Sequence, residues 1–153
     1  MNQYKDLSIF IPTYKRAGMV KTLACLSEAA LKAATLVVRP DEYTTYSDVY
    51  GLKAAILGLP AMVNNLSQTR QFILDKAPTR FCMMLDDDLT FYYRPDRTKW
   101  HLKPMLPAMF DEMIKEMFDH VLELGLAHCA VSPFEGHSHY LDIWNYNLRY
   151  MRC

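Results

Sequence analysis

Short apolar runs alternate along the chain with longer segments in which apolar residues recur every three or four positions. The continuous runs predict buried β-strands over residues 7–11, 35–39, 81–85 and 127–131. The three- and four-residue spacing predicts helices over residues 18–34, about 65–76 and 104–124. Because strands and helices alternate, the sequence favours an α/β fold with a mostly parallel sheet and flanking helices.

Local signals mark the ends of two of these helices. Asn64 and Asn65 offer side chains that cap a helix start, and Pro78 ends the same helix. Gly125 is a natural stop for the last helix. Residues 41–60 mix polar and aromatic side chains without a clean period, so their structure stays open.

Three consecutive carboxylates, Asp86, Asp87 and Asp88, follow directly on an apolar strand. Parallel sheets bind ligands beyond the carboxyl ends of their strands, and carboxylate oxygens are ligands that Mg²⁺ and Mn²⁺ prefer. Alternate side chains of an extended chain share a face, so we expect Asp86 and Asp88 to point into one site and Asp87 away from it. We interpret the cluster as a divalent-metal site; the alternative is a solvated acidic turn.

A second polar group follows the first predicted strand. Tyr14 suits stacking on a nucleotide base, Thr13 suits hydrogen bonding to it, and Lys15 or Arg16 suits contact with phosphate. Residues 1–40 carry six basic and two acidic side chains, which supports an anionic ligand near this half of the chain. The alternative is a solvated basic turn before a helix.

Two further pairs of polar residues lie near the predicted carboxyl edge of the sheet. Arg70, beside Gln71, is placed to reach a diphosphate held at the acidic edge, or it is a surface arginine on an amphipathic helix. Asp41 and Glu42 are placed to accept hydrogen bonds from a base or a ribose, or they belong to an ordinary charged loop.

The composition predicts one globular domain over residues 1–153. A chain of 153 residues with 51% hydrophobic side chains buries a core without disulfide or metal, which excludes intrinsic disorder. A net charge of zero argues against non-specific nucleic-acid binding by the whole domain. The four cysteines lack zinc-ligand spacing and are expected to be reduced. Without a signal-peptide core or an apolar span, we expect a cytoplasmic protein that does not enter a membrane.

The motifs IPTYKR, NNLSQTRQFILDKAP and FCMMLDDDLTFYYR resemble the nucleotide-sugar-binding half of GT-A-fold, family-2-like glycosyltransferases. Within that group, R-x-x-I-L-D followed by L-D-D-D-L looks most like phage glycosyltransferases that act on hydroxymethylated DNA bases. The resemblance covers about residues 7–135 and implies an α/β, Rossmann-like GT-A core. It leaves residues 132–153 as a short acceptor-side segment.

The resemblance also implies roles for individual residues. Asp86, Asp87 and Asp88 match the DxD motif, in which Asp86 and Asp88 hold Mn²⁺ or Mg²⁺ against the donor diphosphate and contact its ribose. Of the remaining donor-binding positions, Thr13 and Arg16 match a base-binding edge, Asp41 matches a base-contacting acid after the second strand, and Arg70 matches a basic residue that faces the diphosphate.

Polar candidates for the acceptor side lie near the end of the sequence. Glu135 and Asp142 are candidates for a general base on an acceptor hydroxyl, beside Asp88 as the third catalytic residue. His139 is a candidate third metal ligand, and His137 shares its face if the segment is extended. The alternative for this segment is a solvated loop.

Together these features predict a metal-dependent glycosyltransferase. It would move a sugar from a nucleotide-diphosphate sugar, most readily a UDP-sugar, to an acceptor hydroxyl, with hydroxymethylated DNA as the expected acceptor. Two alternatives stay open: a remnant that binds a nucleotide sugar without transfer, and a GT-A-like nucleotidyltransferase, which usually has a Gly-rich phosphate loop that is missing after the first strand here. The sequence does not decide between inversion and retention.

Overall fold

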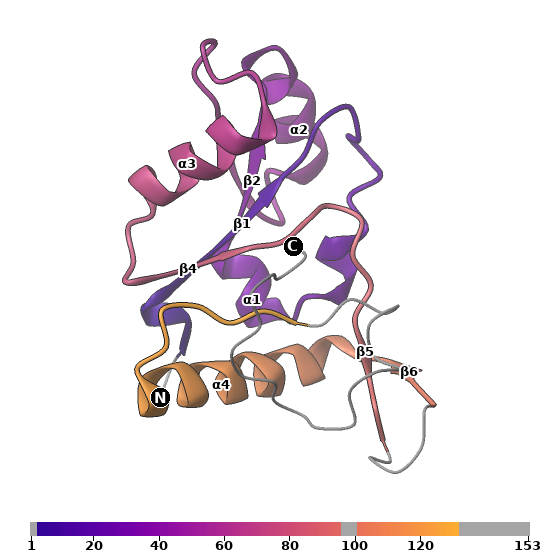
Figure 1. Cartoon of the computed structure of the whole chain (residues 1–153). Coiled ribbons are helices and arrows are strands. Elements are labelled where there is room, and N and C mark those ends of the chain that lie inside the picture. The colour runs from indigo at the N-terminus through magenta and orange to yellow at the C-terminus, as the bar shows by residue number, and fades with distance from the viewer. Residues whose placement is uncertain (1–2, 96–100, 132–153) are drawn as a thin grey trace.

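The structure is a computed structural model that describes residues 3–95 and 101–131. Its centre is a sheet of four parallel strands in the order β3-β2-β1-β4 (Figure 1). These strands are β1 (Leu7–Pro12), β2 (Ala34–Val38), β3 (Ala55–Gly58) and β4 (Phe81–Met84). Farther along the chain, β5 (Tyr92–Tyr93) and β6 (Lys103–Pro104) form a small antiparallel pair. The predicted α/β class and parallel sheet are confirmed.

Helices flank the sheet on both faces. The α-helices are α1 (Glu28–Ala33), α2 (Tyr43–Tyr50), α3 (Leu66–Lys76) and α4 (Pro107–Leu124). Short 3-10 turns are η1 (Gln3–Lys5), η2 (Thr22–Cys25) and η3 (Pro40–Glu42). Residues from α1, α2 and α4 share one buried cluster with β1 and β2, whereas Ile73 of α3 belongs to a second cluster with Phe10 and Val37. The two clusters therefore fill opposite faces of the sheet.

The order of the strands creates a switch point between β1 and β4. From β1 the chain proceeds to β2 and β3 on one side, and then crosses back to place β4 on the other side of β1. Parallel crossovers are right-handed, so this reversal moves the connecting helix α3 to the opposite face. In α/β sheets, ligands bind in the crevice that such a reversal leaves at the carboxyl ends of the strands.

Two predicted helix ends are confirmed. The Asn65 side chain caps α3 by accepting a 2.9 Å hydrogen bond from the Gln68 amide. Gly125 ends α4 with a φ of 62°, in the left-handed region that glycine adopts without a Cβ penalty. Along α4, Phe110, Ile114 and Met117 are buried, so its apolar stripe faces the core as the spacing predicts.

The predicted helix over residues 18–34 is wrong as a continuous element. The chain forms η2, passes through extended Leu26, and restarts as α1 with Ser27 at its N-cap, where Ser27 Oγ accepts a 3.0 Å hydrogen bond from the Ala30 amide. Val20, Leu23 and Ala30 are nevertheless buried. The spacing thus identified the buried positions, but it did not distinguish one long helix from two short ones.

The predicted strand over residues 127–131 is also wrong. These residues have no regular secondary structure, and Val131 is about half exposed. A strand needs a neighbour for its backbone groups, and a short apolar run does not supply one. The open stretch 41–60 contains α2 and β3, and β3 completes the sheet beside β2.

The described residues also bear on the cysteines and on membrane insertion. Cys25, Cys82 and Cys129 are free thiols, and burial raises the pKa of Cys82 and Cys129. Within the described ranges, none of the helices combines the length and apolar character that a membrane crossing requires.

Candidate functional site

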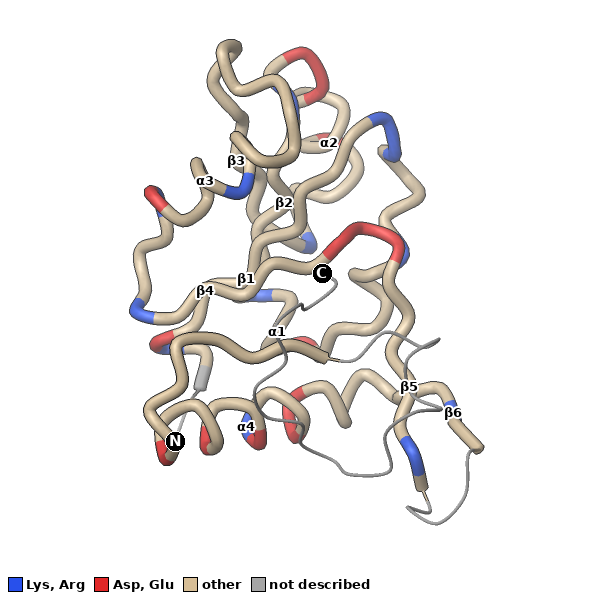
Figure 2. The backbone as a smooth tube through the Cα atoms, viewed as in Figure 1, with Lys and Arg blue, Asp and Glu red and all other residues tan. Residues whose placement is uncertain are grey.

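The acidic loop, defined as residues 86–88, leaves the carboxyl end of β4 next to the loop that leaves β1. Arg16 Nη1 lies 2.9 Å from Asp87 Oδ1 and 2.9 Å from Asp88 Oδ2. Figure 2 shows these basic and acidic stretches facing each other across the end of the sheet. One guanidinium therefore pairs with two carboxylates at the β1/β4 switch point.

This arrangement corrects the expected alternation of side chains along the acidic loop. Asp87 and Asp88 share a partner, although an extended chain would send them to opposite faces. The reason is that β4 ends at Met84 and the chain turns at residues 87–88. The third carboxylate, Asp86, faces Arg70 of α3 instead, with 3.6 Å between Oδ1 and Nη2.

A chain of hydrogen bonds connects the loop that follows β1 (residues 13–21, the β1 loop) to the acidic loop. The Arg16 amide donates to Tyr46 Oη at 2.9 Å, and Tyr46 Oη lies 3.0 Å from Thr13 Oγ1. Thr13 in turn donates to Asp87 Oδ2 at 2.7 Å. Because the Thr13 proton goes to Asp87, the Tyr46 hydroxyl donates to Thr13, and the bonds run in one direction towards the carboxylate.

Sequence reasoning missed Tyr46. Its ring is fully buried beneath the β1 loop and its pKa is raised, mainly by burial, so it stays a neutral phenol. It lies in the stretch 41–60 that showed no clean period, and only its place on α2 reveals that its hydroxyl reaches Thr13 and Arg16.

Arg16 and Asp88 shift each other's pKa. The hydrogen bond to Asp88 and the charge of Asp87 raise the pKa of Arg16. The same hydrogen bond lowers the pKa of Asp88, with the charges of Arg16 and Lys21 adding to the effect. Both side chains are about half exposed, so water and salt screen the pair. The pair holds Asp88 ionised and oriented.

A pocket of about 340 Å³ opens beside these residues at the carboxyl ends of β1 and β2. Its lining comes from the β1 loop, β2, the turn before α3, α3 itself and the acidic loop: Pro12, Thr13, Tyr14, Arg16, Val37, Arg39, Leu59, Asn64, Asn65, Leu66, Thr69 and Asp87. The lining joins an aromatic ring, side-chain amides and cations. Such a set suits a ligand with both a planar ring and negative charge.

Tyr14 and Arg39 form one wall of this pocket. The Arg39 guanidinium lies 5.7 Å from the centre of the Tyr14 ring, and Lys15 Nζ lies 5.0 Å from the same ring. Tyr14 is 51% exposed, so part of its ring remains open to a ligand. Asp41 is exposed and does not belong to the described lining, whereas Arg39, two residues earlier, does.

Two other candidates make contacts outside the acidic loop. Glu42 Oε1 accepts a 2.8 Å hydrogen bond from the Lys15 amide, which supports the left-handed turn at Lys15, where φ is 56°. Gln71 donates to Asp75 along the surface of α3 at 2.8 Å. Glu42 thus shapes the β1 loop, and Gln71 makes a local helix contact. Glu135, His137, His139 and Asp142 lie outside the described residues.

The acidic loop fits a magnesium or manganese ion by its donor chemistry. Mg²⁺ is usually held by one or two carboxylates together with substrate phosphates, and Asp86 and Asp88 are half-exposed carboxylates that could fill this role. No group of three or more His, Cys, Asp or Glu side chains poised to hold a metal exists among the described residues. A metal there would therefore draw its remaining ligands from a bound diphosphate, from water or from residues outside the described ranges.

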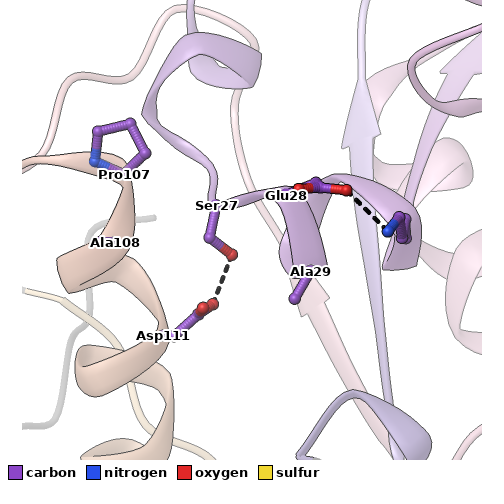
Figure 3. A pocket seen from close by; sticks show the side chains of 7 residues that line it. Ser27, Glu28, Ala29, Pro107, Ala108 and Asp111 are labelled. Atoms are coloured by element: carbon purple, nitrogen blue, oxygen red, sulfur yellow. Dashed lines mark hydrogen bonds and ion pairs between the residues drawn. The ribbon is translucent and has the colours of Figure 1, made fainter.

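A second pocket, of about 490 Å³, lies between the starts of α1 and α4 (Figure 3). Ser27 donates to Asp111 Oδ1 at 2.5 Å across this pocket, and Glu28 pairs with Lys32 at 2.9 Å. Tyr4 donates to the same Asp111 oxygen at 2.5 Å. The two hydrogen bonds to Asp111 join α4 to the N-cap of α1 and to η1, and we interpret this pocket as a seam between packed elements.

The fold and the first site together define an α/β protein with a polar ligand site at a parallel-sheet switch point. The sequence model of the family described as TET-Associated Glycosyltransferase matches residues 7–145. The chain belongs to this family.

Two curated relatives are proteins named beta-glucosyl-HMC-alpha-glucosyl-transferase. The protein of Enterobacteria phage T6 is 34% identical over 84 residues, and that of Enterobacteria phage T2 is 33% identical over 84 residues. Each match covers 55% of this chain and 29% of the relative, so the chain spans less than a third of these relatives. No solved structure gives a significant match. The resemblance to phage glycosyltransferases is thereby confirmed.

Proposed function

We propose that this chain carries the donor site of a glycosyltransferase that moves a sugar from a nucleotide-diphosphate sugar to a hydroxyl on modified DNA. One observation carries the proposal: Thr13 and Arg16, in the loop after β1, meet the acidic loop after β4 at the switch point beside an open pocket. Membership of a glycosyltransferase family supports it, and so do the names of the two phage relatives.

The pocket supplies the nucleotide-binding half of the proposed site. The open part of the Tyr14 ring offers a stacking surface for a base, and Asn64 and Asn65 offer side-chain amides for its edge. We assign the base and ribose to this pocket and the diphosphate to its acidic end, beside Arg16. UDP is the nucleotide that we propose to test first.

Two arginines face the proposed diphosphate. Arg16 approaches the acidic loop from the loop after β1 and Arg70 approaches it from α3, and each side chain is at least one-third exposed. A guanidinium can bind a phosphate with two parallel hydrogen bonds, which suits both residues to holding the negative charge of a leaving diphosphate. Their present carboxylate partners keep them aimed at the acidic loop.

We further propose that the donor is bound with Mn²⁺ or Mg²⁺ held by Asp86 and Asp88. When bound, such an ion supplies positive charge that stabilises the departing diphosphate. Asp87 serves this loop differently, because its two carboxylate oxygens are already engaged by Thr13 and Arg16. Asp87 therefore orients the loop, and Asp86 and Asp88 remain the more open carboxylates.

The acceptor proposal has a charge argument of its own. Residues 89–106 hold four basic side chains and one acidic side chain, whereas the other 135 residues hold 13 basic and 16 acidic ones. In the described part of this segment, Lys103 and Tyr92 are exposed on the β5–β6 pair. Tyr92 follows Asp88 by four residues, so their Cα atoms lie within about 14 Å. DNA bound at the acidic loop would therefore contact Lys103 and Tyr92 of the β5–β6 pair.

The donor proposal is tested by thermal unfolding of the full chain with a panel of nucleoside diphosphates and nucleotide sugars, with Mn²⁺ and then with a chelator. A ligand that binds only the folded state raises the unfolding temperature, and the rise grows with the logarithm of the ratio of ligand concentration to Kd. We expect a metal-dependent rise with one nucleotide that is lost in Asp88→Asn. No rise with any nucleotide would overturn the donor assignment.

Transfer is tested separately with radiolabelled UDP-glucose and duplex DNA that contains hydroxymethylcytosine, either bare or glucosylated. Label in the DNA supports transfer, and release of free glucose without label in the DNA supports a donor hydrolase. Donor binding with neither product favours the second candidate, a nucleotide-sugar-binding unit without transfer. That candidate is motivated by the match to less than a third of the phage relatives.

DNA contact is tested by Lys103→Gln in a fluorescence-polarisation titration with duplex DNA. If Lys103 pairs with a phosphate, its loss weakens binding uniformly across sequences and reduces the salt slope by about one unit. Lys53→Gln is the matched control, because Lys53 is exposed between α2 and β3. Equal effects of both substitutions would remove β5–β6 from the proposed DNA surface.

A further inference from the structure

Thr22, in η2, makes three hydrogen bonds to the backbone of the acidic loop and its neighbour Leu89. Its hydroxyl donates to the Asp86 carbonyl oxygen at 2.5 Å and accepts from the Leu89 amide at 2.9 Å. Its own amide donates to the Asp87 carbonyl oxygen at 3.3 Å. The Thr22 side chain is fully buried, so its hydroxyl is shielded from water.

One hydroxyl therefore closes the turn that carries the carboxylates. The Asp86 carbonyl and the Leu89 amide flank Asp87 and Asp88, and Thr22 joins them by donating to one and accepting from the other. Cys25, also in η2, adds a 3.6 Å contact from its thiol to the Leu89 carbonyl oxygen. The backbone of the acidic turn thus rests on η2, while its carboxylates face Arg16 and Arg70.

We propose that Thr22 is a positioning residue that sets the geometry of the acidic loop for the donor site. The inference rests on the proposed function, because it assigns Thr22 an effect on donor binding. Thr22 does not itself lie in the described pocket lining; it acts through Asp86 and Asp88. Errors of about 1 Å in the placement of catalytic groups can cost a hundredfold in rate, so the loop needs such a support.

The test compares Thr22→Val, Thr22→Ser and Thr79→Val. Valine keeps the shape of threonine but leaves the Asp86 carbonyl and the Leu89 amide without their partner, whereas serine keeps the hydroxyl. Thr79 is a matched control at the opposite end of β4, because its hydroxyl lies 2.8 Å from both Ser8 Oγ and the Phe81 carbonyl oxygen. Thr79→Val therefore also removes two hydroxyl contacts, which are part-buried, but far along the strand from the acidic loop.

Two readouts are measured on the folded full chain. The first is UDP affinity in the presence of Mn²⁺, where we expect Thr22→Val to raise Kd about tenfold or more and the other two variants to stay near wild type. The second is hydrogen exchange of the Leu89 amide, which we expect to be about tenfold faster or more in Thr22→Val alone.

The two readouts separate the possible failures. Wild-type UDP affinity and Leu89 exchange in folded Thr22→Val would overturn the role of Thr22. Absence of UDP binding in the wild type would overturn the donor proposal, and with it the effect on donor binding that we assign to Thr22. Hydrogen exchange of the Leu89 amide would still show whether Thr22 holds the acidic turn in place. If Thr22→Val does not fold, Thr22→Cys carries the same prediction, because a thiol fills the space but hydrogen-bonds weakly.

Discussion

Thr13 Oγ1 donates a 2.7 Å hydrogen bond to Asp87 Oδ2, joining two residues that lie 74 positions apart in the sequence. The bond ties the carboxyl end of β1 to the acidic loop after β4. Thr13 is buried and its hydroxyl also meets Tyr46, so its geometry is fixed from two sides. The switch point is therefore a preorganised polar site.

Replacing Thr13 tests this connection. In Thr13→Val, Asp87 loses a donor and the buried Tyr46 hydroxyl loses its acceptor, so we expect a loss of stability of about 1–3 kcal/mol and weaker UDP binding with Mn²⁺. Thr13→Ser retains the hydroxyl and should bind UDP nearly as well as the wild type. Urea unfolding and a UDP titration measure both effects; equal behaviour of the two variants would exclude a role for the hydroxyl.

The Arg16–Asp88 pair predicts a definite pH dependence. The pKa of Asp88 is lowered from its usual 3.8, so the folded state binds this proton less readily than the unfolded state. Its contribution to stability is therefore present above pH 3.8 and is lost as the pH falls through the lowered pKa. The raised pKa of Arg16 contributes no acid-side dependence, because Arg16 stays protonated throughout this range.

An NMR titration of the Asp88 carboxyl carbon measures this coupling. We expect its pKa to rise towards the usual value in Arg16→Gln, and to rise in the wild type as salt is added, because both side chains are half exposed. Lys115→Gln, which removes an exposed ion pair with Asp119 on α4, is the control. If the pKa of Asp88 is the same in Arg16→Gln as in the wild type, the Arg16–Asp88 pair does not persist in solution.

Arg70 should contribute to diphosphate binding more than to folding. Its ion pair with Asp86 is long, at 3.6 Å, and partly exposed, so Arg70→Ala should change unfolding little. Loss of a charge-assisted contact to phosphate should raise the Kd for UDP about tenfold. Arg80→Ala is the control, because Arg80 lies over the Phe81 ring at the other end of β4. Similar Kd values for both variants would remove Arg70 from the donor site.

The packing of α4 predicts a large effect on stability. Phe110 is fully buried, and its ring meets Phe91 edge-on with centroids 5.4 Å apart. Phe110→Ala should lower the free energy of unfolding by about 3–5 kcal/mol. Leu106→Ala, at a side chain that is 67% exposed, should lower it by less than about 0.5 kcal/mol. Urea unfolding measures both, and comparable losses would contradict this placement of α4.

The sequence by itself determined the strands that bear the site and the order of their functional groups. Apolar runs report burial on both faces, so β1 and β4 were predicted within a residue of their ends, and the chemistry of residues 13–16 and 86–88 followed from those ends. The caps of α3 and α4 were predictable for the same reason, since Asn65 and Gly125 act on the backbone next to them.

Only the tertiary structure decided which of these groups meet. Strand order depends on pairing between segments far apart in the chain, and the local sequence of a strand does not indicate which strand it will pair with. The break between η2 and α1 is an example. The apolar spacing fits one helix, but Thr22 hydrogen-bonds to the acidic loop and Ser27 caps a new helix. The roles of Tyr46 and Thr22 arise from such distant contacts, because a buried hydroxyl takes its function from the groups that packing brings within reach.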